Sequence, residues 1–156
     1  MVRSILLKKF REYDRCHQTR GNEICHFFGV SMIVLSVFGY LSKQLLTTAV
    51  IADVAYLPIS AASVIWLITF GIYTWLDWKV GIPFSIFTLS FLAISTLLPY
   101  SVCFTLFCFG WIFQGIGHVI FENKSPAFFQ NLTHLIIGPI WVFSRAVGYY
   151  RGNEDV

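Results

Sequence analysis

Hydrophobic residues are gathered into long uninterrupted stretches along most of this chain. Residues 80–121 contain no Asp, Glu, Lys or Arg over 42 positions, and Pro99 divides them near the middle. A helix that crosses a bilayer needs about 20 mostly apolar residues, so this stretch is long enough for two. Further apolar stretches cover residues 27–42, 54–76 and 125–144. The pattern predicts an all-α fold, a polytopic membrane helix bundle of four to five transmembrane or re-entrant helices.

A basic segment precedes the first apolar stretch. Six of the first 26 residues are Lys or Arg, and in "ILLKKFREY" they alternate with apolar residues at roughly helical spacing. This spacing predicts an interfacial helix, held on the cytosolic side by its positive charge. Its apolar runs are too short for a signal peptide. We therefore expect one integral membrane domain over residues 1–156, with a basic arm over 1–22 and a helix bundle over 23–149.

Composition narrows the function classes. Charged residues are 12% of the chain, against about 25% in soluble domains. The net charge of +3 is concentrated in the basic arm, where membrane lipid accounts for it, so no nucleic-acid partner is predicted. The four cysteines form no CxxC pair, which excludes zinc-ribbon and thioredoxin-type sites and predicts free thiols. No phosphate loop, GxSxG elbow or dinucleotide fingerprint is present.

Local signals predict where the helices begin and end. A break at residues 20–22 should separate the interfacial helix from the first span, with Asn22 as the N-cap. A polar loop is expected after Lys43, and the chain should return to the cytosolic side near residues 77–79. Ser125 and Pro126 have the form of an N-cap followed by proline at the first helical position. Pro139 allows the last segment to be kinked or re-entrant.

The predicted topology brings all four histidines to the cytosolic face. They are His17, His26, His118 and His134. A single histidine near a helix end is ordinarily a hydrogen-bonding or interfacial side chain. Four on one face also suit a metal site, and imidazole ligands without thiolates fit iron, zinc, copper or nickel. The residues alone leave both interpretations open.

Polar residues at helical spacing surround one of these histidines. Gln114, His118 and Glu122 follow each other at i, i+4 and i+8, so they share one face of a helix. A metal-bound imidazole needs its second ring nitrogen held by a hydrogen-bond partner. Gln114, Glu122 and Asn22 are therefore the candidate catalytic or supporting residues. Gly115 and Gly117 are expected to allow close helix packing.

Three motifs resemble a known family. Residues 17–30, "HQTRGNEICHFFGV", have the form H-x4-N-x3-H-x2-G; residues 114–129, "QGIGHVIFENKSPAFF", have the form Q-x2-GH-x2-FE-x3-PA; "NLTHLIIGPIWVF" follows at 131–143. In this order they resemble the Mpo1-like family of small membrane proteins, typified by a 2-hydroxy fatty acid dioxygenase. The resemblance covers nearly the whole chain. It departs at Ser144 and Arg145, where the family often has an acidic residue.

The resemblance implies a specific activity. It implies an iron(II)-dependent dioxygenase of fatty acid α-oxidation, in which a 2-hydroxy fatty acid and O2 yield an acid one carbon shorter and CO2. The resemblance also implies that this reaction belongs to breakdown of the sphingoid base phytosphingosine. The four histidines would be the iron ligands. The expected location is the endoplasmic reticulum membrane of a eukaryote, or the inner membrane of a bacterium. A 2-hydroxy acid can chelate Fe(II) through its carboxylate and its hydroxyl, and its oxidation balances with one O2.

Two other classes remain open on the sequence. The first is a zinc-dependent membrane hydrolase, for which Glu122 is the available water-activating carboxylate. The second is a non-catalytic membrane protein in which the histidines join helices by hydrogen bonds. Metal analysis separates them, because zinc with turnover independent of O2 favours the hydrolase and no bound metal favours the structural role.

Overall fold

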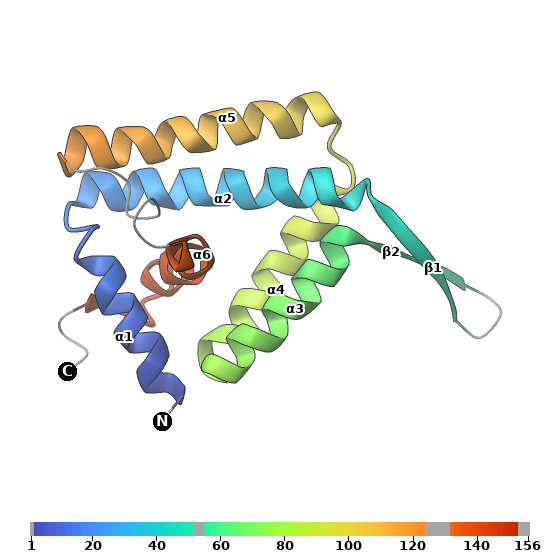
Figure 1. The fold of residues 1–156 in the computed structure, drawn as a ribbon, viewed down its shortest axis with the longest axis horizontal. Helices are drawn as coiled ribbons and strands as arrows, with labels where there is room; N and C mark the ends of the chain where they lie inside the picture. Colours follow the sequence, from blue (N-terminus) through green and yellow to red (C-terminus); the bar gives the residue numbers. More distant parts are fainter. Residues whose placement is uncertain (1, 52–54, 124–131, 153–156) are drawn as a thin grey trace.

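The computed structural model describes residues 2–51, 55–123 and 132–152, which form a bundle of helices with one β-hairpin (Figure 1). The helices are α1 (Val2–Asp14), α2 (Arg20–Ser42), α3 (Ala61–Leu76), α4 (Trp78–Ser95), α5 (Tyr100–Ile116) with its π-helical continuation η1 (Gly117–Phe121), and α6 (Thr133–Ala146). Within the described residues, three helices are long and apolar enough to cross a membrane: α2, α4, and α5 with η1. The predicted all-α membrane bundle is confirmed.

Helices α2 and α5 form an antiparallel pair and lie side by side along their length (Figure 1). Small residues allow the close approach, as is usual between membrane helices. A Cβ atom added to Gly29 would lie 2.8 Å from the backbone oxygen of Gly110, and one added to Gly39 would lie 2.3 Å from Sγ of Cys103. Because the pair is antiparallel, the start of α2 and the end of α5 lie at the same end of the bundle.

The remaining helices pack against this pair. Helices α3 and α4 form a hairpin that turns at Asp77, whose side chain caps α4 by accepting from the Lys79 amide. Helix α6 crosses beneath the start of α2, and α1 runs beside it (Figure 1). The buried apolar core joins these elements through residues such as Phe10, Tyr73 and Trp141. The core therefore lies at the end of the bundle where α2 begins.

Contacts between distant segments define the two ends of the bundle. Arg3 Nε lies 3.3 Å from a carboxylate oxygen of Asp77, so the α3–α4 turn lies at the same end as α1. At the other end, Lys43 Nζ donates to the backbone oxygen of Thr96 over 2.7 Å. These contacts agree with the predicted alternation of the turns between the two faces.

The loop expected after Lys43 is instead an antiparallel hairpin of β1 (Leu45–Ile51) and β2 (Ala55–Ser60). Thr, Val and Ile in β1 favour an extended backbone. Helix α3 begins only at Ala61, because Ser60 and Ser63 form a reciprocal capping box there. The uncharged stretch 54–76, expected to contain the second span, therefore includes β2 as well as α3. At 16 residues, α3 is shorter than the other membrane helices.

The cap of α2 lies three residues earlier than predicted. Thr19, not Asn22, caps α2, because the Thr19 side chain accepts from the Asn22 amide. The break between α1 and α2 accordingly covers residues 15–19 and not the predicted 20–22. The predicted helix start at Ser125 and Pro126 lies outside the described residues. The described part of the last segment is α6, 14 residues that include Pro139.

Candidate metal centre

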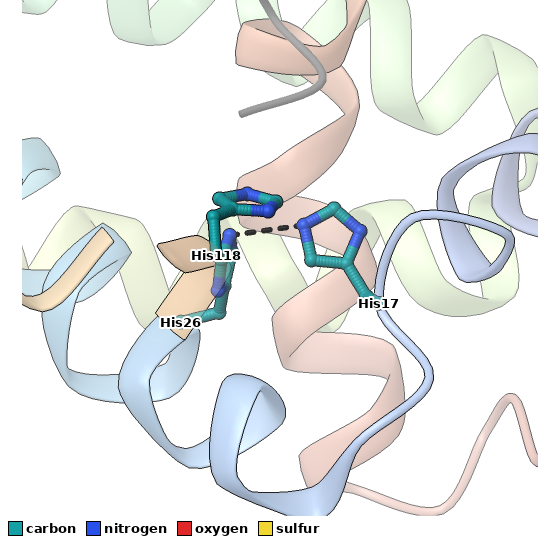
Figure 2. Close-up of side chains that lie close together, drawn as sticks. All are labelled: His17, His26 and His118. Carbon is teal, nitrogen blue, oxygen red and sulfur yellow. Dashed lines mark hydrogen bonds between the residues drawn. The ribbon is translucent and has the colours of Figure 1, made fainter. Parts of the chain in front are cut away.

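The break between α1 and α2 turns His17 back toward His26. Nine residues along one continuous helix would point the two side chains in nearly opposite directions. In the structure Nε2 of His17 lies 3.0 Å from Nε2 of His26, and Figure 2 shows the two rings meeting through this contact. The predicted break between the two helices is therefore present, although it begins earlier than expected, and it allows the two rings to meet.

Backbone carbonyls determine which nitrogen of each ring carries the proton. Nδ1 of His17 lies 2.7 Å from the Tyr13 oxygen, and Nδ1 of His26 lies 3.0 Å from the Asn22 oxygen. A carbonyl oxygen only accepts hydrogen bonds, so both Nδ1 atoms are the donors. Burial, and next the neighbouring His26, lower the pKa of His17 to about 2, so its ring is neutral. Two Nε2 lone pairs therefore face each other at 3.0 Å, which is repulsive without a cation between them.

His118 completes the group from the end of the other helix. Its ring centroid lies 4.8 Å from that of His17 and 4.9 Å from that of His26. One nitrogen of each ring lies within 4.8 Å of the others. All three side chains are buried, at 3%, 1% and 2% exposure for His17, His26 and His118. Figure 2 shows three rings from three chain segments gathered around one point.

This donor set fits a divalent transition-metal ion. Two imidazole nitrogens bound at right angles to one ion, with bonds of about 2.1 Å, lie about 3.0 Å apart. The Nε2 atoms of His17 and His26 have this separation. The facing lone pairs and the all-imidazole set mean that the three side chains can act as ligands of such an ion. All four cysteines are free, as predicted.

Local widening of α5 positions His118. The helix changes to π-helical hydrogen bonding in η1, a feature often found at functional sites. Gly117 contacts α2 here, because a Cβ atom added to it would lie 2.4 Å from Oδ1 of Asn22. No atom of the described residues lies within 4 Å of a Cβ atom added to Gly115. The expected role in close packing is confirmed for Gly117 and wrong for Gly115.

Glu122 fixes the turn that carries His17. Its Oε1 atom accepts hydrogen bonds from the backbone amides of Gln18 at 2.6 Å and Thr19 at 2.8 Å. The Thr19 hydroxyl and Nδ2 of Asn22 donate to the same atom, at 3.1 and 3.2 Å. Burial raises the pKa of Glu122, but these hydrogen bonds outweigh it and lower the pKa below its ordinary value. Glu122 and Asn22 thus join the end of α5 to the start of α2.

Gln114 and His134 lie beside the three histidines. Both line one cavity with His17, His26 and His118. The Gln114 side chain packs on Gly29, where an added Cβ atom would lie 2.5 Å from its Nε2. The ring of His134 meets Tyr13 edge-on, with the centroids 5.4 Å apart. His134, predicted as a fourth ligand, does not belong to the group of close nitrogen atoms found among the described residues.

Tyr13 and Trp141 were not identified from the sequence as residues of the site. The Tyr13 ring stacks on His17 with centroids 3.9 Å apart and planes 3° apart, and Trp141 lies 4.8 Å from Tyr13. The available signal was the position of Tyr13 four residues before His17, one helical turn away. Asp14 then fixes this packing, since it accepts from Nε1 of Trp141 at 2.8 Å and from the Tyr150 hydroxyl at 2.5 Å.

Comparison with known proteins gives one family and one relative. The model of the family described as "2-hydroxy-palmitic acid dioxygenase Mpo1-like" matches residues 4–150. The 2-hydroxy-palmitic acid dioxygenase MPO1 of Saccharomyces cerevisiae is 45% identical over 38 residues, which cover 24% of this chain and 22% of the yeast protein. The match thus spans less than a quarter of that relative. No solved structure matches.

Proposed function

This chain belongs to the Mpo1-like family, and we propose that it is an iron(II)-dependent dioxygenase that acts on 2-hydroxy fatty acids. The reaction is RCH(OH)COOH + O2 → RCOOH + CO2 + H2O. The C1–C2 bond breaks, C2 becomes the new carboxyl carbon, and the substrate supplies all the electrons that reduce O2. The observation that carries the proposal is the pair of facing Nε2 lone pairs on His17 and His26, with His118 beside them. The family description supports the substrate class.

His17, His26 and His118 would hold the iron. When bound, the iron supplies the redox chemistry through which O2 oxidises the 2-hydroxy acid. The carbonyls of Tyr13 and Asn22 hold the Nδ1 protons, which keeps each Nε2 available as a ligand. Burial keeps these imidazoles away from bulk water.

Other residues of the chain position the centre and the substrate. Glu122 and Asn22 hold the turn that carries His17, so we assign them a positioning role. Gln114 and His134 line the cavity beside the histidines and would contact the carboxylate end of the substrate. The basic arm at this end of the bundle supports a cytosolic orientation of the centre. The membrane would be that of the endoplasmic reticulum in a eukaryote, or the cell membrane in a bacterium.

A turnover assay tests this proposal. Detergent-solubilised protein loaded anaerobically with Fe(II) is given 2-hydroxypalmitate and O2, with His26→Ala as the control. We expect the fifteen-carbon acid and one CO2 per O2 consumed, without 2-oxoglutarate or a nicotinamide cofactor. Palmitate should be inert, because it lacks the 2-hydroxyl group. Hydrolysis of esters or amides without O2, with no shortened acid, would replace this proposal with the zinc hydrolase.

A further inference from the structure

The cavity of about 380 Å³ that contains the histidines continues away from them along two helices. On α2 its lining runs from His26 through Val30 and Val34 to Val37, a spacing that keeps to one face of the helix. On η1 and the antiparallel α5 it runs from His118 back to Phe107. The last lining residues on the two helices are Phe38, twelve residues from His26, and Phe107, eleven residues from His118. At a rise of 1.5 Å per residue, the lining of the cavity is about 16–18 Å long.

The floor of this groove is apolar and its polar groups are already paired. The floor comes from the α3–α4 hairpin, where Tyr73, Phe84 and Thr88 are 4%, 5% and 7% exposed. The Tyr73 hydroxyl donates to a backbone oxygen of α6 over 2.6 Å. The Thr88 hydroxyl accepts from the Trp66 indole and donates within its own helix. Beyond the histidine end, the groove therefore offers its occupant mainly apolar contacts.

The rim of the groove is exposed. Phe107 on α5 is 37% exposed, and Leu135 and Ile136 on α6 are 49% and 52% exposed. Among the described helices, α5 makes its extensive contacts with α2 and with its own continuation η1. The cavity is nevertheless lined by both α5 and α6. Among the described residues, the exposed rim of the cavity therefore lies between these two helices, on a surface that lipid covers in a membrane.

The length and position of the groove match one leaflet of a bilayer. The hydrocarbon core is about 30 Å thick, so its midplane lies about 15 Å from either interface. Because α2 and α5 are membrane-spanning helices with the histidines at one end, the groove reaches from the interface to the region of the midplane. A fatty acid in that leaflet has the same placement, with its carboxylate at the interface and its methyl end near the midplane.

We propose that this groove binds the acyl chain of one fatty acid taken sideways from the adjoining leaflet, through the opening between α5 and α6. The assignment of the carboxylate end to the histidines rests on the proposed function. The acyl chain moves from lipid into an apolar groove without crossing water, so its transfer gains little hydrophobic free energy. Recognition then depends on the polar end of the substrate and on the shape of the groove.

Photochemical cross-linking tests the groove directly. Two 2-hydroxypalmitate probes, with a diazirine near C3 or near the methyl end, are bound anaerobically to the full protein in lipid nanodiscs. We expect the methyl-end probe to label residues 34–38 and 107–111, and the C3 probe to label positions nearer Val30 and Gln114. Excess unlabelled 2-hydroxypalmitate should remove both signals. Labelling spread evenly over the lipid-facing surface, and insensitive to competition, would overturn the proposal.

A matched pair of variants adds a second readout. Val34→Trp fills the groove, whereas Val102→Trp adds the same bulk on α5 outside its lining. Labelling by the methyl-end probe should fall at least tenfold in the first variant and stay unchanged in the second. An equal effect in both variants would count against the groove.

The two proposals can fail separately. Specific labelling without turnover of 2-hydroxypalmitate would reject the dioxygenase and keep the groove. Turnover with dispersed labelling would reject the groove and keep the dioxygenase. The positions labelled in the unmodified protein decide between these outcomes even if Val34→Trp does not fold.

Discussion

Two histidines of the centre are oriented by backbone carbonyls of their own chain segments. His17 and His26 each use Nδ1 to bind the backbone oxygen four residues earlier. This spacing is helical and could be read in the sequence, as could the face shared by the histidines. The role of Glu122 could not, because its partners Gln18 and Thr19 lie about a hundred residues away. The same holds for Trp141, which reaches His17 only through the packing of α6 on α1.

Metal removal should destabilise the protein through His17 and His26. Without a cation their lone pairs repel each other, so iron should bind the folded state in preference to the unfolded chain. At free iron a hundredfold above its dissociation constant, the stabilisation is about 2.7 kcal/mol. We expect a chelator to lower the thermal unfolding midpoint of the unmodified protein, measured by intrinsic fluorescence. The same chelator should leave the midpoint of His17→Ala unchanged, and an equal shift in both proteins would count against the site.

Glu122→Gln should weaken the turn that carries His17. The change removes the charge that strengthens the hydrogen bonds from Gln18, Thr19 and Asn22, at a cost of roughly 1–3 kcal/mol in unfolding free energy. Iron occupancy should fall with it. Glu12→Gln is the matched control, because it removes a surface ion pair with Lys9 that contributes about 0–1 kcal/mol. Equal stability and iron content in both variants would make Glu122 an ordinary surface residue.

Helices could be predicted from the sequence where an apolar stretch was long enough to cross a membrane. Helices α2, α4 and α5 follow the apolar stretches, because each needs about 20 such residues. Within stretch 54–76 the pattern did not separate β2 from α3, since their apolar residues have similar hydropathy. Ser60 marks the true start through its capping box with Ser63. The π-helical turn of η1 has no comparable signal and depends on the contact of Gly117 with α2.

Gly117→Ala should disturb the metal centre, because Gly117 lies in η1 next to His118 and packs against α2. The added methyl group would overlap Asn22 and push the end of α5 away from α2, at a cost of about 1–3 kcal/mol. Displacement of His118 should lower iron occupancy. Gly115→Ala provides the control two residues away, since among the described residues its methyl group meets open space. That variant should keep its iron and unfold at the same or a slightly higher temperature.

In the whole molecule, the membrane helices determine how deep in the bilayer the three histidines lie. The antiparallel pair α2 and α5 brings His26 and His118 to one end (Figure 1). The turn after α1 adds His17 at that end, and the groove extends from there toward the bilayer midplane. Topology predicted from charge was sufficient to gather these three residues. The predicted topology placed His134 at the same face, but it could not show that His134 lies outside the group of close nitrogen atoms.

The iron content of the anaerobically purified protein shows whether His17, His26 and His118 form a metal centre. We expect about one iron per chain in the unmodified protein, measured by mass spectrometry of the metal, and a loss of most of it in His17→Ala, His26→Ala and His118→Ala. His134→Ala should keep its iron if three histidines hold the ion, whereas loss there would support four ligands. Full iron content in all three variants of the group, or zinc in place of iron in an active protein, would contradict the account.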